Sequence, residues 1–286
     1  MSQPIEPIPV QRLLDEAVKL TRKHFARIVP PVAVPMGLAG GLAAAAQIPA
    51  QTAEGGGSLW QMALFVGSAL FVLVAIGLGS GAVTAAALDA AAGREPDMKR
   101  AWLTFLRPRV LLTGILTSIG IVAGMMCCVV PGIYLALLWS VVLPVVLEEG
   151  SFGFTALARS AELMQHNPTG ALQNDPRFRV FVVLFAGFLL GYSLAFIVQL
   201  PLGIVMAIAM ARELAKGESA DAQQMMRPLL WLQIPTNMLS MALNACTQLF
   251  TMSGVSILYF DVRRRREGLD LEQAVERLGS QAAGEP

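Results

Sequence analysis

The sequence predicts an all-α, polytopic helical membrane protein with about six transmembrane helices and amphipathic interfacial helices on the cytoplasmic side. Hydrophobic residues make up 55% of the chain and charged residues only 14%, against about 25% charged in a soluble domain. The mean hydropathy is +0.60. Long apolar runs recur along the chain, and basic residues gather in alternate connections between them, as in multi-pass membrane proteins.

The longest run without Asp, Glu, Lys, Arg or His covers the 38 residues Val110–Leu147. A single helix of this length would measure roughly 57 Å, nearly twice the thickness of a hydrocarbon core of about 30 Å. Two helices fit, and we place the break between them at Pro131-Gly132, because such a pair commonly ends a helix. The run therefore predicts a membrane hairpin with spans at about 110–130 and 132–147.

Four further apolar stretches predict the remaining spans, at about 28–50, 59–90, 178–200 and 229–260. Several prolines lie in the first, so we expect it to be kinked or partly unwound. The second is long enough that it should tilt or protrude from the bilayer. After Pro201, the fifth span should continue to residue 210 as a kinked or re-entrant extension. The spans form one integral membrane domain, 1–268, followed by a short cytoplasmic helix and polar tail, 269–286.

Three segments beside the spans are amphipathic, with apolar residues on one helical face and basic residues among them. They cover residues 10–28, 97–107 and 153–166. This pattern is typical of helices that lie in the headgroup region of a bilayer. For the first segment a solvated cap is the alternative. We expect the three segments to form a collar at the cytoplasmic headgroups.

The distribution of basic residues predicts the orientation. Six spans place both termini on one side, and that side then holds 18 of the 21 Lys and Arg residues. The three others are Arg212, Lys216 and Arg227. Because basic loops face the cytoplasm, we predict a multi-pass protein of the bacterial cytoplasmic (inner) membrane with both termini cytoplasmic. Five basic residues precede the first apolar run, which does not fit a cleaved secretory signal.

Signals for enzymatic chemistry are weak. Cys127, Cys128 and Cys246 lie in apolar runs, which fits neither a disulfide framework nor a zinc site. His24 and His166 have no spaced partner, and neither a phosphate-binding glycine loop nor a nucleophile elbow occurs. We therefore predict no catalytic, cofactor or metal site. The net charge of +1 indicates no nucleic-acid partner.

Small residues recur four apart inside the predicted spans, at Gly37 and Gly41, Gly77 and Gly81, Gly120 and Gly124, and Gly187 and Gly191. Such pairs let helix backbones approach closely. We predict that they serve helix packing, with a specific dimer face as the alternative.

The last span carries a polar stripe with a spacing of three or four residues: Asn237, Ser240, Asn244, Gln248 and Thr251. Residues at this spacing share one helical face. The stripe either forms hydrogen bonds to neighbouring helices or lines a polar path through the membrane. We favour hydrogen bonding, because no ionisable residue lies within the stripe and transporters of protons or charged solutes usually need one.

Four consecutive basic residues follow the last span: Arg263, Arg264, Arg265 and Arg266. Near an anionic membrane surface each charge contributes about 1 kcal/mol, so the run predicts contact with lipid headgroups. A charge block that only fixes orientation is the alternative. The expected function is a non-enzymatic scaffold or lipid-interacting protein whose partners are membrane lipids, with a homo-oligomer or another membrane protein possible. A transporter or lipid-flipping permease using the polar stripe is the alternative.

Two stretches carry a resemblance to a known family. In the hairpin and the segment after it the residues concerned are Pro131, Gly132, Tyr134, Pro144, Glu148, Ala158 and Ser160, and at the end of the last span they are Leu258, Tyr259, Asp261, Arg263, Arg265 and Glu267. With its order of spans, the chain resembles the bacterial glycerophosphoryl diester phosphodiesterase membrane-domain family and its YciC-like relatives. The family name comes from members fused to a catalytic barrel. Spans and linkers use up these 286 residues, so the resemblance implies the membrane part without the phosphodiesterase activity.

Overall fold

The computed structural model describes residues 8–52, 59–165, 174–216 and 230–267, and all secondary structure in them is helical. The helices are α1 (Val10–Thr52), α2 (Leu59–Ala91), α3 (Met98–Phe105), α4 (Pro108–Cys127), α5 (Val129–Leu138), α6 (Val142–Glu149), α7 (Phe154–Leu163), α8 (Pro176–Lys216) and α10 (Gln233–Glu267).

Six helical segments in the described part of the chain are long and apolar enough to cross a membrane: Val10–Ile48, Leu59–Ala91, Pro108–Cys127, Val129–Glu149, Pro176–Val205 and Gln233–Arg266. The predicted all-α class and the six long apolar helices are thereby confirmed. The predicted tail at 269–286 lies outside the described residues.

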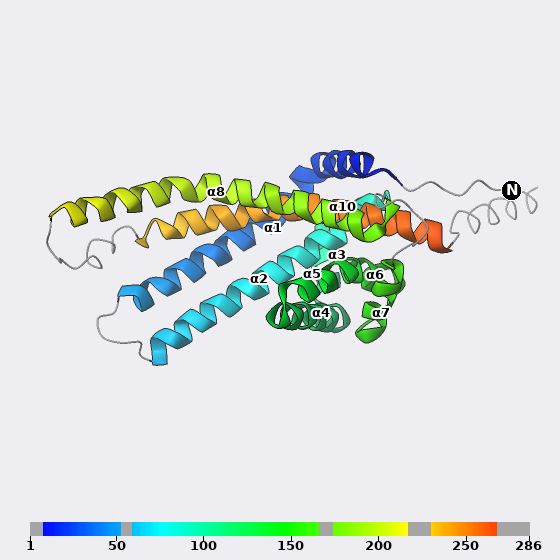
Figure 1. Ribbon diagram of the computed structural model, residues 1–286, viewed down its shortest axis with the longest axis horizontal. Helices are drawn as coiled ribbons and strands as arrows, with labels where there is room; N and C mark the ends of the chain where they lie inside the picture. The colour runs from blue at the N-terminus through cyan, green and yellow to red at the C-terminus, as the bar shows by residue number, and fades with distance from the viewer. Residues whose placement is uncertain (1–7, 53–58, 166–173, 217–229, 268–286) are drawn as a thin grey trace, which may run out of the picture.

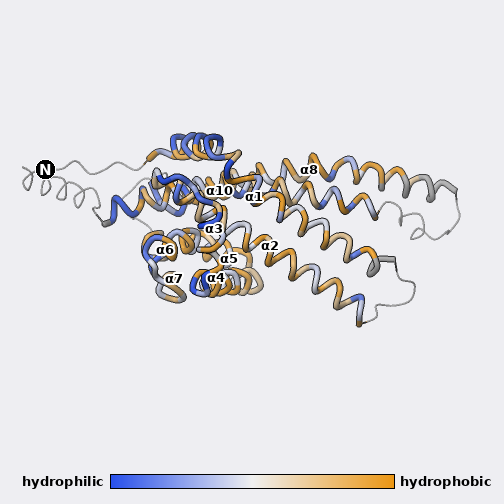
Figure 2. Tube along the Cα trace, turned by 180° about the vertical axis from the view of Figure 1, so that it is seen from behind, coloured by the Kyte–Doolittle hydropathy of each residue, from blue (hydrophilic) through white to orange (hydrophobic). Residues whose placement is uncertain are grey.

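Helix α10 is the centre of the packing. It lies against α1, α2 and α8, and Figure 1 shows these four long helices extending together from one end of the molecule. The α4–α5 hairpin, α6 and α7 lie beside that end. The hydrophilic segments gather there, whereas the long helices extend away as mainly hydrophobic arms (Figure 2). We call this the polar end. The outer faces of α2, α4 and α8 expose large apolar side chains such as Phe65, Ile119 and Phe188.

Helix α1 combines two predicted elements in one. The amphipathic segment 10–28 and the span 28–50 form a single helix of 43 residues, with no connection between them. Figure 1 shows that the helix changes direction along its length. Pro30 and Pro31 lie in its interior, and prolines there remove hydrogen bonds and clash with the preceding turn, so they bend a helix.

The break in the hairpin is not at Pro131-Gly132, and the predicted spans 110–130 and 132–147 shift accordingly. Cys128, with φ −166° and ψ 150°, separates α4 from α5. Pro131 lies in the first turn of α5, where a helix tolerates proline because the N–H groups there lack intrahelical acceptors. Gly132 packs against α4: a Cβ added at Gly124 of α4 would lie 3.1 Å from the Cα atom of Gly132. The Pro-Gly pair therefore starts a helix. The second arm has its own break, at 139–141 between α5 and α6.

Helix α8 runs without interruption from Pro176 through Pro201 to Lys216, so the extension predicted beyond 200 continues the same helix. Its 41 residues correspond to about 62 Å, roughly twice the hydrocarbon thickness. Helix α10 begins and ends later than the predicted span 229–260. The predicted surface segments 97–107 and 153–166 appear as α3 and α7, although residue 166 lies outside the described residues.

Candidate functional site

Ion pairs at the polar end join segments that are far apart in the sequence. Arg94, which follows α2, places its Nε 2.8 Å from Oδ1 of Asp89 and donates through Nη2 to Oε1 of Glu148. The hydrogen bond to Glu148 is the main cause that raises the pKa of Arg94 above its ordinary value. The Arg94 guanidinium therefore stays charged and links the end of α2 to the end of α6.

Glu149, the last residue of α6, receives contacts from two other helices. The hydroxyl of Tyr259 donates to Oε1 of Glu149 at 2.9 Å, and Nε of Arg159 donates to Oε2 at 3.1 Å. The Nε atom of Arg263 lies 3.8 Å from the same carboxylate. Gly150 follows with φ +70°, a conformation that glycine adopts readily and that commonly ends a helix. Glu149 thus ties α6 to α7 and α10.

Among the ion pairs of the described residues, the most deeply buried one joins α8 and α10. Nη1 of Arg179 donates to Oδ2 of Asp261 at 2.8 Å, and the two side chains are 0% and 5% exposed. Arg265 donates to the same oxygen at 2.9 Å. The second terminal nitrogen of Arg179 donates to the backbone carbonyl of Ile8 at 2.7 Å. The pair therefore also holds the residues just before α1.

The four arginines predicted to contact lipid have different roles. Arg263 and Arg265 bind carboxylates within the protein, as described above. Arg266 donates to the backbone carbonyls of Glu162 and Gln165, at 2.6 and 2.9 Å, at the end of α7. Arg264 is exposed and has no hydrogen bond or ion pair to any described residue. Among the described residues, therefore, Arg264 is the member of the run that no other group engages.

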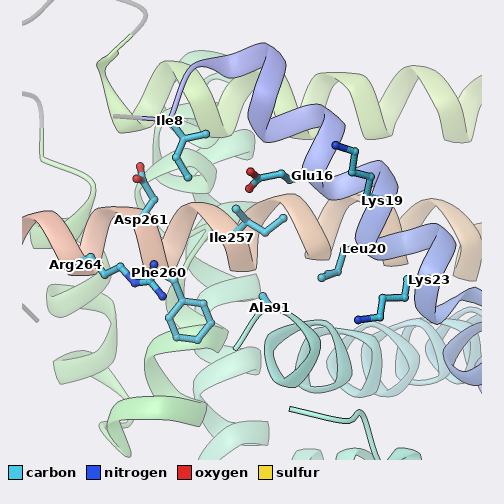
Figure 3. A pocket seen from close by; sticks show the side chains of 10 residues that line it. All are labelled: Ile8, Glu16, Lys19, Leu20, Lys23, Ala91, Ile257, Phe260, Asp261 and Arg264. Carbon is cyan, nitrogen blue, oxygen red and sulfur yellow. The ribbon is translucent and has the colours of Figure 1, made fainter. Parts of the chain in front are cut away.

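Arg264 lines a pocket of about 480 Å³ between the first part of α1 and the last turns of α10. Figure 3 shows Lys19 and Lys23 on the α1 side and Asp261 and Arg264 on the α10 side. We call it the α1–α10 pocket; its lining residues are Ile8, Glu16, Lys19, Leu20, Lys23, Ala91, Ile257, Phe260, Asp261 and Arg264. Its volume lies in the range of about 300–1,000 Å³ that is usual for small-ligand sites.

The charge of this pocket favours an anion. Lys19, Lys23 and Arg264 are three cations against the carboxylates of Glu16 and Asp261, and two arginines already compensate Asp261. Leu20, Ile257 and Phe260 supply an apolar wall. In the described part of the chain, no three His, Cys, Asp or Glu side chains form a group that could hold a metal ion.

The polar stripe lies along α10, and its hydrogen bonds with described residues stay within that helix. Asn237 donates to the carbonyl of Gln233 at 2.9 Å, Gln248 donates to Oδ1 of Asn244 at 2.7 Å, and Thr251 donates to the carbonyl of Thr247 at 2.9 Å. Oγ of Ser240 and Oε1 of Gln248 are buried without a described partner.

Most of the predicted glycine pairs lie at helix contacts. A Cβ at Gly37 or Gly41 would meet Met238 of α10, and one at Gly187 or Gly191 would meet Thr251 or Thr247 of α10. Gly120 faces Trp139, and Gly124 faces Gly132 and Leu135. Gly81 is buried in α2, whereas a Cβ at Gly77 would meet no described atom within 4 Å. The seams with α10 therefore depend on glycines from α1 and α8.

From the sequence alone no role is assigned to Arg179 or Glu149, and Glu148 appears only among the residues that carry the family resemblance. In the structure these three residues form the ion pairs that connect separate segments at the polar end. A carboxylate or guanidinium beside a long apolar run is a candidate for pairing with an opposite charge, because it needs such a partner wherever packing buries it. The sequence does not say which partner, since Arg179 and Asp261 are 82 residues apart.

Comparison with protein-family models, with characterised proteins and with solved structures finds no match for this chain. The class of protein therefore rests on the helices themselves. Six apolar helices of membrane-spanning length suggest a multi-pass membrane protein.

Proposed function

We propose that this protein is a non-enzymatic integral membrane protein of the bacterial cytoplasmic membrane that binds the headgroup of an anionic phospholipid in the α1–α10 pocket. The observation that carries the proposal is the arrangement of Lys19, Lys23 and Arg264 around an apolar wall. An anionic phospholipid combines the same two properties, a phosphate beside a hydrocarbon chain. Basic pockets between helices at the cytoplasmic side are sites for anionic headgroups.

The charge distribution supports an orientation with both termini in the cytoplasm. Ion pairs and hydrogen bonds at the polar end connect the start of α1, the connection after α2, the end of α6, α7, the start of α8 and the end of α10. These are the segments that hold most of the basic residues. Under the positive-inside rule this end faces the cytoplasm. We also propose that the chain is related to the glycerophosphoryl diester phosphodiesterase membrane-domain family, which it resembles in sequence.

The test is a titration with phosphatidylglycerol in mild detergent, in which native mass spectrometry counts the bound lipids. The variant Lys19→Gln/Lys23→Gln/Arg264→Gln removes the three cations of the pocket. At about 1 kcal/mol for each charge, we expect the apparent affinity of the first lipid to fall on the order of 100-fold. An unchanged affinity would refute the proposed site.

A matched control removes the same charge elsewhere on the polar end. Arg22, Lys99 and Arg100 are exposed, and none of them lines the pocket. The variant Arg22→Gln/Lys99→Gln/Arg100→Gln should keep the affinity of the first lipid within about threefold. An equal loss in both variants would indicate that total charge governs binding, not the pocket.

One observation favours the second candidate, a transporter or lipid-flipping permease. Oγ of Ser240 and Oε1 of Gln248 are buried without a described partner, and buried polar atoms normally bind something. Single cysteines at positions 240, 244 and 248, treated with a charged thiol reagent from each side of the membrane, test this candidate. Labelling from either side would favour a path, and uniform protection would exclude it.

A further inference from the structure

A second pocket, separate from the α1–α10 pocket, lies between the hairpin and α7. It has a volume of about 390 Å³, and its walls include Leu116 and Gly120 of α4, Trp139, and Phe154, Ala158 and Ala161 at α7. All its lining side chains are apolar. We call it the α4–α7 pocket. Small side chains leave the space open, and a Cβ at Gly120 would overlap the ring of Trp139.

The rim of the α4–α7 pocket continues into exposed apolar surface. Ile119 and Phe154, which line the pocket, are 60% and 76% exposed, and Leu112 on α4 is 62% exposed. Because α4 belongs to the apolar hairpin, a bilayer would cover this surface with hydrocarbon. The pocket therefore opens toward lipid chains and not toward water.

A cation lies beyond one end of the α4–α7 pocket. Arg109 is in the first turn of α4, seven residues before Leu116, so the two residues share one face of the helix about 10 Å apart along its axis. The guanidinium of Arg109 lies 5.2 Å from the centre of the Phe152 ring. Arg109 is exposed, and no ion pair joins it to a carboxylate of the described residues.

We propose that the α4–α7 pocket holds one acyl chain of a bilayer phospholipid whose phosphate is bound by Arg109. The apolar walls fit an acyl chain, and the positive charge of Arg109 fits the phosphate. The separation of about 10 Å between Arg109 and Leu116 along α4 lies within the length of one phospholipid. The exposed rim lets a chain enter from the surrounding bilayer. This site uses no residue of the α1–α10 pocket, so it does not depend on the function proposed above.

Fluorescence of Trp139 provides a direct test, because this side chain lines the pocket. The three other tryptophans are replaced in the variant Trp60→Phe/Trp102→Phe/Trp231→Phe, and the protein is reconstituted with phosphatidylglycerol that carries bromine atoms in mid-chain. Bromine quenches a tryptophan that it touches. Filling the pocket by Ala161→Phe should reduce quenching at least twofold, and Ala158→Leu serves as a second filling variant.

The control for pocket filling is Ser118→Phe, which adds the same ring to an exposed position of α4 outside the pocket. It should leave quenching unchanged. If Ala161→Phe and Ala158→Leu also leave quenching unchanged while the protein remains folded, only lipid around the protein is being detected and the proposal fails. Quenching that disappears as protein is concentrated in the bilayer would show a second copy in the pocket, which also overturns it.

The phosphate contact is tested with two brominated lipids. Arg109→Gln should lower quenching by brominated phosphatidylglycerol to the level given by brominated diacylglycerol, which has no phosphate. Arg100→Gln, at an exposed position of α3, should not. Equal quenching by the two lipids in the unmodified pocket would remove Arg109 from the proposal.

Discussion

The hydroxyl of Tyr259 donates a hydrogen bond of 2.9 Å to Oε1 of Glu149, and the two residues are 110 positions apart in the chain. Tyr259 is fully buried in α10, and Glu149 ends the second arm of the hairpin. The contact thus fastens the hairpin to the central helix of the molecule. Nη1 of Arg263, one turn further along α10, donates to the same hydroxyl at 3.3 Å.

Tyr259→Phe should destabilise the protein by about 1.5–3 kcal/mol, because it removes a hydrogen bond to a charged acceptor and keeps the ring. Thermal unfolding in detergent measures the effect. Tyr192→Phe is the control, since Tyr192 is 64% exposed on α8 and its hydroxyl has no hydrogen bond to a described residue. Equal melting temperatures for the two variants would contradict the assigned contact.

Asp261→Asn should cost about 3–5 kcal/mol, because it leaves the buried guanidinium of Arg179 without its counter-charge. Adding Arg179→Met should restore part of the stability, since the unpaired charge is then gone. Glu95→Gln is the control: its ion pair with Arg27 is exposed and worth about 0–1 kcal/mol. The result that would count against the pair is a double variant less stable than Asp261→Asn alone.

Gly187→Ala should weaken the contact of α8 with α10 by about 1–3 kcal/mol, because the new Cβ would overlap the side chain of Thr251. Thr251→Ala in the same chain should relieve the overlap. Gly203→Ala is a matched control on α8, where a Cβ meets no described atom within 4 Å. It should be neutral or stabilising, since Ala favours helix over Gly by about 1 kcal/mol. Similar effects at the two glycines would disprove the close approach.

The arginine run should divide into two functions. Arg266→Gln removes the donor that binds the carbonyls of Glu162 and Gln165, so amide hydrogen exchange in α7 should become faster while lipid affinity changes little. Arg264→Gln should do the opposite, lowering affinity for phosphatidylglycerol about fivefold and leaving exchange in α7 unchanged. Four equivalent arginines would instead give the same pair of readouts for both variants.

The number of long apolar helices could be predicted from the sequence because it depends on local composition. A run free of charge must avoid water, and its length fixes how many helices it contains. Positions of breaks were harder, since they depend on tertiary contacts. Pro131-Gly132 can end one helix or begin the next. In the structure the pair lies at the start of α5, where Gly132 packs against α4.

The candidate site was predicted only in part. The arginines after the last span were identified by charge, but which of them is free depends on carboxylates elsewhere in the chain. The carboxylate of Glu149 lies beside Arg263, and the carboxylate of Asp261 forms an ion pair with Arg265. Lys19 and Lys23 were assigned to a surface helix, yet their position opposite Arg264 requires the packing of α1 on α10. Long-range partners of this kind leave no periodic signal in one sequence.

The orientation of the polar end is the central claim, and fusions after Pro286 test it most directly. One fusion carries a fluorescent protein that matures only in the cytoplasm, and the other carries an alkaline phosphatase that is active only in the periplasm. We predict a fluorescent first fusion and an inactive phosphatase, because 18 of the 21 Lys and Arg residues then remain on the cytoplasmic side. An active phosphatase with a dark fluorescent fusion would contradict the orientation, and with it the proposed cytoplasmic lipid site.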